Sequence, residues 1–366
     1  MIPLFKVFMS DAVREPVLKT LYSGFVGQGP VVQQFEKALA ERFNNRNVLT
    51  LSAGTHGLHL ALVLAGVKRG HEVITTPLTC TASNWPILMQ GASPVWADVK
   101  DDLNIDPASV KEQLTDKTKA ILCVHWGGYP CDLHELHSIA KKAGVVLIED
   151  AAHAYGATYR KTTIGDCAYS DFTMMSFQAI KHLTCVDGGA LFCRDKGHYD
   201  RGKLLRWYGI DREGPRSDFR CEMPIAEAGF KYHMNDVCAT VGLHNMAGAE
   251  ENIKRCIENA NYYNRELSSV PGVRVTQTAG DRQSSYWLYT ILVENRSEFC
   301  YMMASKGISV SRVHERNDKH PCVTHYRGDE LPTLEKIITQ HISIPVGWWV
   351  TKEQREYIVD AIKGGW

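Results

Sequence analysis

Short apolar runs alternate with helix-period stretches from about residue 47 onward, and this alternation restricts the fold more than any other feature of the sequence. We expect strands at residues 48–51, 72–76, 94–98, 120–125, 145–149, 171–177 and 189–193. Helix-period segments such as 56–66 and 132–143 lie between the first five. Near-continuous apolar strands that alternate with helices indicate a mainly parallel sheet covered on both faces. The sequence therefore predicts an α/β fold with a seven-stranded, mainly parallel sheet.

The pattern changes near residue 245. A long polar helix is expected from about residue 249 to 267, followed by a strand over 285–293 and by further helices and strands. A chain of 366 residues is long enough for two domains. We therefore predict a large domain over 1–245, which holds the sheet, and a smaller α+β domain over 246–366.

Composition excludes several classes of protein. Lys and Arg together number 41, as do Asp and Glu, so nothing suggests a nucleic-acid partner. The sequence has no apolar run of about 18 residues and no basic, then apolar, N-terminal signal, so we expect neither a membrane span nor a signal peptide. The eleven cysteines form no C-x-x-C pair, which indicates reduced thiols and no structural metal. A cytoplasmic protein is the expectation.

Candidate functional groups follow several strands of the predicted sheet. Gly54 and Thr55 follow the first strand, Asp150 follows the fifth, Ser176 lies at the end of the sixth, and Lys181 lies in the turn after it. Ligands of open parallel sheets bind beyond the carboxyl ends of the strands. We therefore expect these side chains to meet at one edge of the sheet.

These groups together suit pyridoxal 5′-phosphate (PLP). A lysine amine can form a Schiff base, a carboxylate can pair with the pyridinium nitrogen, and the helix start at Gly54 can bind the phosphate. Residues 172–186 carry no charge apart from Lys181 and His182, and apolar surroundings lower the pKa of a lysine. Three simpler interpretations stay open: Thr55 as a plain helix cap, Asp150 as a cap or metal ligand, and Lys181 as a solvated surface lysine.

Three patterns resemble other sites but fail on spacing or context. Residues 197–203 have the glycine spacing of a P-loop, but Leu204 stands where a Mg²⁺-binding Ser or Thr belongs. His134 and His137 are one residue short of the zinc-protease spacing. The spacing of His56 and His59 is more typical of packed side chains than of metal ligands. For Trp348-Trp349, core and interface both stay open.

The sequence resembles the DegT/DnrJ/EryC1/StrS family of PLP-dependent sugar aminotransferases over nearly its whole length. The segments that carry the resemblance are 23–30, 52–59, 72–77, 124–130, 149–154, 176–189, 229–236 and Ile344-Pro345. The resemblance implies the PLP-dependent transferase fold type I, that of aspartate aminotransferase. It also implies a homodimer whose active sites are shared between the two subunits.

The resemblance also implies roles for individual residues. Lys181 is the predicted catalytic residue, which carries the cofactor, Asp150 pairs with the ring nitrogen, and His153 lies against the ring. The full set of predicted cofactor-binding residues is Gly54, Thr55, His56, Cys80, Asp150, His153, Ser176 and Lys231. Among them, Lys231 would reach the phosphate in the partner subunit's site. The chain departs from the family at Cys80, where many members have a stacking aromatic residue, and what replaces it is open.

We expect the chain to move an amino group from L-glutamate to a nucleotide-linked keto-sugar by a ping-pong Schiff-base mechanism, with Lys181 as general base and acid. A 4-keto-6-deoxy sugar is favoured on family frequency alone. The predicted substrate contacts are Trp126, Tyr129, Arg312, His314 and Arg316; for the arginines, a surface ion pair is the alternative. Alternatives for the whole chain are a cyclitol aminotransferase, a sugar dehydratase, in which histidine replaces the lysine, and a non-catalytic regulatory relative.

Overall fold

The computed structural model describes residues 1–215, 224–277, 279–326 and 330–366. Its centre is a seven-stranded sheet, built from β1 (Val48–Leu51), β2 (Glu72–Thr75), β3 (Ser93–Trp96), β4 (Thr118–Val124), β5 (Val146–Asp150), β8 (Phe172–Ser176) and β9 (Gly189–Cys193). The strand order is β1-β9-β8-β5-β4-β2-β3. β9 runs antiparallel to both of its neighbours, and every other neighbouring pair is parallel. The predicted seven-stranded, mainly parallel sheet is confirmed.

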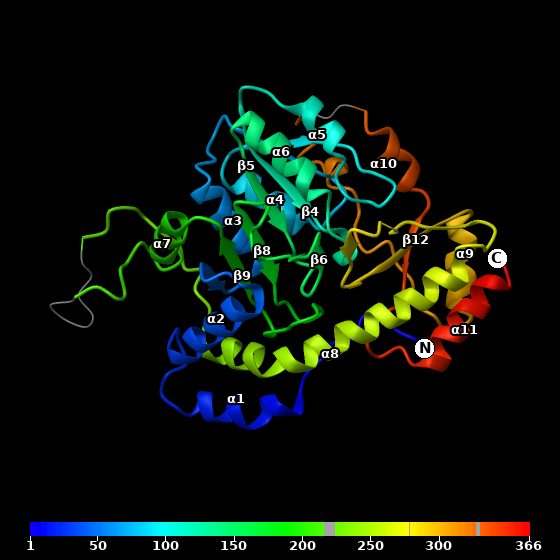
Figure 1. Ribbon diagram of the computed structural model, residues 1–366, viewed down its shortest axis with the longest axis horizontal. Helices are drawn as coiled ribbons and strands as arrows, with labels where there is room; N and C mark the ends of the chain where they lie inside the picture. The colour runs from blue at the N-terminus through cyan, green and yellow to red at the C-terminus, as the bar shows by residue number, and fades with distance from the viewer. Residues whose placement is uncertain (216–223, 278, 327–329) are drawn as a thin grey trace.

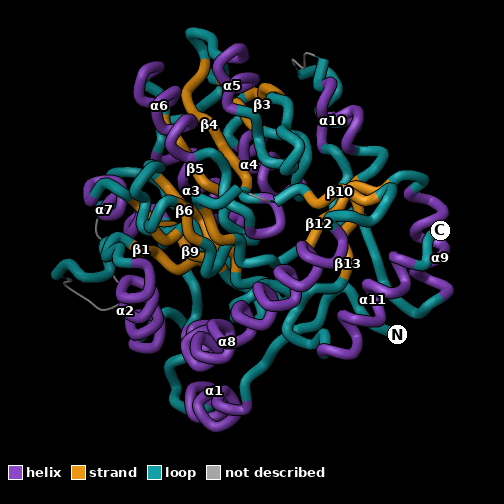
Figure 2. The backbone as a smooth tube through the Cα atoms, turned by 45° about the vertical axis from the view of Figure 1, so that its right-hand side comes forward, coloured by secondary structure: helices purple, strands orange, loops and turns teal. Residues whose placement is uncertain are grey.

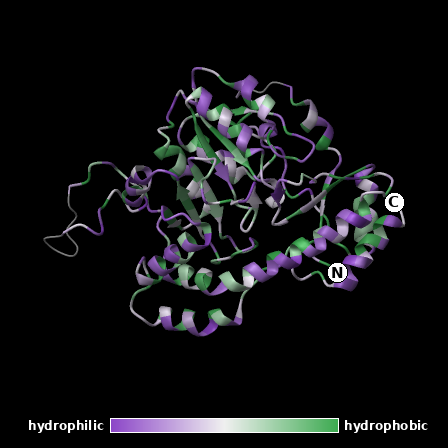
Figure 3. Cartoon of the chain, in the orientation of Figure 1, coloured by the Kyte–Doolittle hydropathy of each residue, from purple (hydrophilic) through white to green (hydrophobic). Residues whose placement is uncertain are grey.

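Helices cover both faces of this sheet (Figure 1). They are α2 (Pro30–Phe43), α3 (Gly54–Leu64), α4 (Thr81–Met89), α5 (Pro107–Gln113), α6 (Leu133–Ala143), α7 (Lys196–Leu205) and α8 (Asp236–Leu267). Because successive side chains of a strand point to opposite faces, Val73 belongs to the apolar cluster that includes residues of α3, α4 and α7. Its neighbour Ile74 belongs to the cluster that includes residues of α2, α5, α6 and α8. Burial on both faces explains the continuous apolar runs of the sequence, which appear in Figure 3 as a green sheet between helices with hydrophilic outer faces.

The C-terminal part of the chain has a small sheet of its own (Figure 2), and most of its elements share one apolar cluster. Its elements are β10 (Val273–Val275), β12 (Tyr289–Val293), α9 (Arg296–Ser305), α10 (Pro332–Ile337), β13 (His341–Ile344) and α11 (Lys352–Lys363). The three strands form an antiparallel sheet. The remaining elements are η1 (Asp11–Val13), α1 (Arg14–Leu21), η2 (Trp126–Gly128), β6 (Thr158–Tyr159), β7 (Thr162–Thr163), β11 (Arg282–Gln283) and η3 (Asn317–Lys319).

The N-terminal segment packs on the C-terminal part of the chain. Ile2 belongs to its apolar cluster and forms a β-bridge with Ile308. The indole of Trp349 donates a hydrogen bond to the Pro3 carbonyl at 2.9 Å, and Trp348 packs edge-on against Phe8 with ring centroids 5.5 Å apart. Within one chain, the Trp348-Trp349 pair therefore holds the N-terminal segment in place.

Two predicted element starts were wrong. The long helix expected from residue 249 begins at Asp236, because the Asn235 side chain caps it by accepting the Cys238 N–H. This helix, α8, passes unbroken through residue 245, and the division of the chain at that residue stays a prediction. The strand expected over 285–293 begins at Tyr289, because Ser285 and Leu288 donate their N–H groups to the Gly127-Gly128 turn instead.

No helix within the described ranges is long and apolar enough to cross a membrane. In those same ranges, no three His, Cys, Asp or Glu side chains gather closely enough to hold a metal ion. The ten described cysteines are free thiols.

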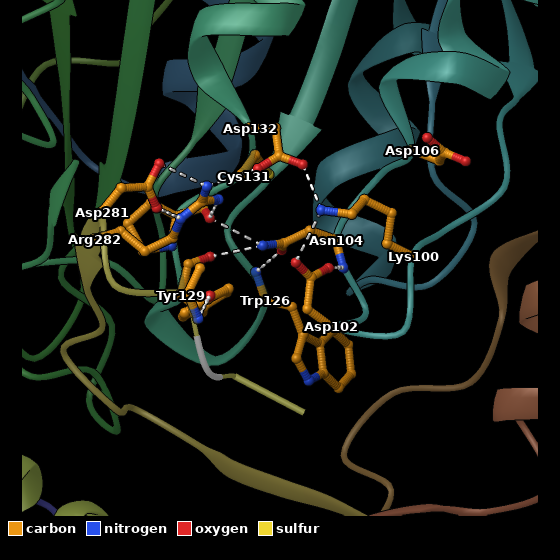
Figure 4. A network of polar contacts seen from close by, with 12 residues as sticks. Lys100, Asp102, Asn104, Asp106, Trp126, Tyr129, Cys131, Asp132, Asp281 and Arg282 are labelled. Carbon is orange, nitrogen blue, oxygen red and sulfur yellow. Dashed lines mark hydrogen bonds and ion pairs between the residues drawn. The ribbon is translucent and has the colours of Figure 1, made fainter. Parts of the chain in front are cut away.

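A polar network joins the loop between β4 and α6 to the C-terminal part of the chain (Figure 4). The Arg282 guanidinium lies 2.7 Å from a carboxylate oxygen of Asp132 and donates to the Pro130 carbonyl at 2.9 Å. The Lys100 amine lies 2.5 Å from the other oxygen of Asp132. The side chains of Arg282 and Asp132 are only 6% and 14% exposed. Burial opposes the charge of Asp132, but the hydrogen bonds from Lys100 and Arg282 outweigh it and lower the pKa of this carboxyl.

Asn104 fixes the same loop from inside. Its amide donates to the carbonyls of Tyr129 and Pro130, at 3.0 and 3.2 Å, and its side-chain oxygen accepts the Trp126 N–H at 2.9 Å. The loop from Trp126 to Asp132 is therefore tied on both sides (Figure 4).

We expect Arg282→Ala to lower the free energy of unfolding by about 3 kcal/mol, because it removes one cation from a mostly buried carboxylate. Urea denaturation at neutral pH measures this loss. Since the pKa of Asp132 is lowered in the folded chain, its contribution is complete above the pKa of an unfolded aspartate, about 3.9. It is lost as the pH falls through the folded value, so the parent and the variant should converge in acid.

Arg274→Ala is the matched control. Arg274 also pairs across the two parts of the chain, with Asp101 at 2.7 Å, but these side chains are 41% and 63% exposed. An exposed pair contributes at most about 1 kcal/mol. Equal losses in Arg274→Ala and Arg282→Ala would contradict a role for the buried network.

Candidate active site

A cavity of about 550 Å³ opens at the carboxyl ends of the parallel strands. Asp150 at the end of β5 and Ser176 at the end of β8 line it, together with Gly54 and Thr55 at the start of α3. Lys181, in the loop between β8 and β9, lines it too. The structure thus brings together the residues that the sequence placed after different strands.

The Lys181 amine lies in the cavity against the face of an aromatic ring. Its nitrogen is 3.7 Å from the ring centroid of Trp287. Burial lowers the pKa of Lys181 to about 8, although the charges of Asp150 and Cys80 act in the opposite direction. An amine with this pKa is roughly one-tenth neutral at pH 7, so it can act both as a nucleophile and as a proton carrier.

The Asp150 carboxylate is buried, with 3% of the residue exposed. One oxygen accepts the Ser83 hydroxyl at 2.6 Å, and the other accepts the Ala152 N–H at 3.0 Å. Burial raises the pKa of Asp150, and the two hydrogen bonds and the charge of Lys181 moderate the rise. Among the described residues, no Arg or Lys forms an ion pair with Asp150, and a buried carboxylate in that state favours a cationic ligand. The protonated ring nitrogen of PLP is such a cation.

The start of α3 offers an open anion site. Its N-cap residue is Ala53, which makes no side-chain hydrogen bond to the first turn. The first N–H groups of a helix lack intrahelical partners and attract anions. A Cβ added at Gly54 would lie 3.0 Å from the Met174 sulfur and 3.0 Å from the Ser176 Cβ, so glycine keeps the helix start close to Ser176. This cradle fits a phosphate group, and with Lys181 and Asp150 it fits PLP.

Three rings form one wall of the cavity. His153 stacks on Trp287, with centroids 3.9 Å apart and planes at 20°, and lies parallel to His314 at 5.8 Å. Burial lowers the pKa of His314 to about 4 and that of His153 well below its usual range, so both imidazoles are neutral at neutral pH. Within the described part of the chain, His153 Nδ1 and His314 Nε2 are buried atoms without a hydrogen-bond partner. Both can therefore accept or donate a hydrogen bond to a ligand.

Cys80 lines the cavity at the start of α4 but carries no ring. The aromatic side chains among the cavity residues are Phe5, His153, Trp287 and His314. These are the surfaces on which a flat ligand can stack.

Two predicted cofactor residues lie outside this cavity. His56 stacks on Tyr232, with centroids 4.1 Å apart, and shares a 2.9 Å hydrogen bond with the Ser52 hydroxyl. Lys231 is exposed and forms a β-bridge with Trp207. Neither residue lines the cavity within the single chain.

The structure places most of the predicted substrate contacts away from the cavity. Trp126 is 1% exposed, and its indole donates to the Thr290 hydroxyl at 3.0 Å. Tyr129 is 3% exposed, and its hydroxyl accepts the Ala279 N–H at 2.9 Å. Packing between the two parts of the chain buries these two residues, and neither lines the cavity, so their contact with substrate stays a prediction.

The two predicted arginines make ion pairs. Arg316 is buried, pairs with Asp318 at 2.6 Å and with Glu335 at 2.7 Å, and does not line this cavity. Arg312 pairs with Glu315. His314 is therefore the predicted substrate contact that lines the cavity.

Sequence reasoning missed Trp287 and Ser83, which hold the two central groups. Trp287 lies more than a hundred residues after Lys181, in a segment without a motif, and only the packing of the C-terminal part brings them together. Ser83 sits in the first turn of α4. In the sequence, the only indication of a role for Ser83 is that it carries a hydroxyl three residues after Cys80.

Comparisons with known proteins agree with this geometry. A model of the DegT/DnrJ/EryC1/StrS aminotransferase family matches residues 9–363. The chain is similar to AtS13 from Actinomadura melliaura (41% identity, TM-score 0.96, 100% of this chain and 99% of that one). It is similar to the sugar aminotransferase CalS13 from Micromonospora echinospora (39% identity, TM-score 0.96, 100% of both chains). GDP-perosamine synthase from Escherichia coli O157:H7 is 30% identical over 93% of this chain and 95% of that protein.

Proposed function

The chain belongs to the DegT/DnrJ/EryC1/StrS aminotransferase family, and we propose that it transfers an amino group from L-glutamate to a nucleotide-linked keto-sugar. It is a PLP-dependent sugar aminotransferase; the donor and the acceptor are the proposed part. The observation that carries the proposal is the cavity in which the Lys181 amine, the Asp150 carboxylate and the open start of α3 meet. The name of the E. coli relative pairs a nucleotide with an amino sugar, which supports a nucleotide-linked acceptor.

The residues that would hold PLP are those of the cavity. The N–H groups at the start of α3, with the hydroxyls of Thr55 and Ser176, would take the phosphate. Asp150 would pair with the ring nitrogen, and Ser83 keeps that carboxylate in place. His153 would lie against the ring. When bound, PLP supplies an aldehyde that carries the amino group and a ring that draws electrons from a breaking C–H bond.

Lys181 supplies the proton transfer. Its amine lies on the face of Trp287 and feels the charge of Asp150, and burial keeps a fraction of it neutral at neutral pH. A neutral amine can take a proton from the α-carbon of the donor, and the ammonium that results can deliver that proton to a second carbon on the same face. Asp150 stays negative next to a protonated ring and so keeps that ring an electron acceptor.

His314 and His153 give the acceptor side of the cavity its polarity. Their unpartnered nitrogens suit hydroxyl groups of a sugar, which both donate and accept hydrogen bonds. We favour a 4-keto-6-deoxy sugar on family frequency. Arg312, two residues before His314, is a second proposed contact; its partner Glu315 is exposed and can be released. A cyclitol would also present hydroxyls, so the assay must include one.

We also propose that two copies of the chain form a homodimer with shared active sites. A group of apolar side chains lies exposed on α1 and the loop after it, namely Leu18, Leu21, Tyr22, Phe25 and Val26. Exposed apolar groups of this kind mark association surfaces. The exposed Lys231 and the half-buried His56 lie outside the chain's own cavity, as expected if Lys231 serves a partner's site. The cytoplasmic location stays a prediction.

The first half-reaction has a direct optical test. We expect the purified chain loaded with PLP to show a visible absorption band that L-glutamate shifts to shorter wavelength, and we expect Lys181→Ala to lack that response. Asp150→Asn should slow the response about 100-fold or more, because the ring nitrogen loses its paired charge. A band that ignores L-glutamate but responds to another amino acid would overturn the proposed donor.

His314→Phe tests the acceptor site separately. We expect the KM for the keto-sugar nucleotide to rise about 10-fold, the loss of one hydrogen bond, while the response to L-glutamate stays at the parent level. Steady-state assays with a panel of keto-sugar nucleotides and one keto-cyclitol measure this. His134→Phe, at an exposed position of α6, is the control. A defect confined to the L-glutamate step would contradict an acceptor role for His314.

The dimer is tested by mass. We expect sedimentation equilibrium to give about twice the chain mass of 41.0 kDa, and Phe25→Glu to shift the equilibrium toward the single chain, because it buries a charge in an apolar contact. A parent protein that stays monomeric at micromolar concentration would contradict the proposal of active sites shared between two subunits.

A further inference from the structure

Trp287 holds the Lys181 turn at two points. Its indole N–H donates to the carbonyl of Ile180, the residue before the lysine, at 2.8 Å. The face of the same ring lies 3.7 Å from the lysine amine. Residues 177–188 belong to no helix or strand. A few backbone hydrogen bonds close this loop, among them Lys181 N–H to the Gln178 carbonyl at 2.9 Å, but none of them holds the lysine side chain. The indole is therefore a specific tie between the lysine and the rest of the fold.

The backbone that carries Trp287 is itself held tightly. Ser285 and Leu288 donate to the carbonyls of Gly128 and Gly127, at 3.2 and 3.1 Å. A Cβ added at Gly128, whose φ is +94°, would lie 2.5 Å from the Ser285 hydroxyl and 2.7 Å from the His153 carbonyl. Glycine is thus needed there both for the left-handed backbone and for the close approach. The Trp126-Gly127-Gly128 segment therefore places Trp287.

The ring can act on the amine in both of its charge states. An aromatic face attracts an ammonium group within about 6 Å, and more strongly where water is excluded. A ring that is 7% exposed also covers the neutral amine. Phe5 packs behind it, with ring centroids 5.1 Å apart, so the indole cannot swing toward the N-terminal segment without displacing that ring.

We propose that Trp287 is a positioning residue for Lys181, whose ring keeps the amine in one place and shields it from water while the amine gains and loses a proton. The inference rests on the proposed function, because it assumes that Lys181 carries protons during transamination. Trp287 forms no covalent bond with Lys181 and acts on the amine only by contact.

Several titratable groups face the amine and act on its proton beside the ring. They are Asp150 at the end of β5, Cys80 before α4, His153 after β5, His182 next in the chain, and His314 in the C-terminal part. The three imidazoles are neutral at neutral pH, since burial lowers the pKa of each. Asp150 is the main opposite charge, and any variant of Trp287 leaves it in place.

The test measures the lysine itself, in the full chain freed of PLP. Competitive labelling with acetic anhydride between pH 6 and 11, followed by mass spectrometry of the Lys181 peptide, gives the midpoint at which the amine loses its proton. In the parent we expect a midpoint near 8. Trp287→Leu removes the attraction of the ring for the ammonium, which lowers the midpoint, and admits water, which raises it. Because burial has the larger effect on this amine, we expect a net rise of about one unit, which lowers labelling at pH 8 about fivefold.

Trp366→Leu is the matched control. The indole of Trp366 also donates to a carbonyl at 2.8 Å, that of Glu294, and packs on Phe299, far from the lysine in the fold. It should leave the midpoint unchanged. A midpoint in Trp287→Leu that equals the parent's, in a chain with parent-like circular dichroism, overturns the proposal.

If Trp287→Leu does not fold, Trp287→Phe provides a second test of the proposal. It keeps a ring but loses the bond to the Ile180 carbonyl, so we expect kcat for the L-glutamate step to fall about 10-fold while KM stays within about threefold. A parent-like kcat overturns the proposal, as does a fall that Trp366→Phe reproduces. Because labelling needs neither donor nor acceptor, it still gives its answer if the proposed substrates are wrong.

Discussion

The site depends on one electrostatic constraint, the burial of a lysine amine and an aspartate carboxylate in the same cavity. Burial shifts each pKa toward the neutral form, downward for Lys181 and upward for Asp150. Their mutual attraction opposes these shifts without cancelling them. Two such groups are costly unless a ligand satisfies them. A ligand with a protonated ring nitrogen and an electrophilic carbon satisfies both, so the affinity for the cofactor and the reactivity of the lysine have a common origin.

The surroundings of Asp150 show how the fold maintains this arrangement. Asp150 ends a central strand, and its carbonyl accepts the His125 N–H from β4's end at 3.1 Å. Beneath it, the His125 ring bonds Glu149 at 2.8 Å, and Glu149 also accepts the Thr173 hydroxyl from β8. Adjacent buried strands are thus linked by side chains as well as by their ladders. The carboxylate oxygens of Asp150 cannot turn away from the cavity, because Ser83 and the Ala152 N–H each occupy one of them.

The seven-stranded sheet and the meeting of Asp150, Ser176 and Lys181 in one cavity could be predicted, for a physical reason. Strands buried on both faces leave continuous apolar runs, and the residues that follow such strands must converge at one edge of a parallel sheet, as Asp150, Ser176 and Lys181 do. Trp287 and the burial of Trp126 and Tyr129 could not be predicted, since they depend on how residues far apart in sequence pack. The start of α8 was missed because the polar side chain of Asn235 decides it, rather than an apolar period.

The wall of the cavity opposite the sheet is built at a conformational cost. Tyr286 and Val313, which directly precede Trp287 and His314, have φ values of +51° and +68°. Residues other than glycine pay about 1 kcal/mol or more in this left-handed region, and a β-branched residue is rarely found there. The two positions lie in separate loops, yet each turns the next side chain toward His153. Because this strain would relax if the loops were free, the contacts that hold the C-terminal part against Gly127-Gly128 and Asp132 also keep the aromatic wall in the cavity. The residues that shape the chemistry therefore include some that never touch a ligand.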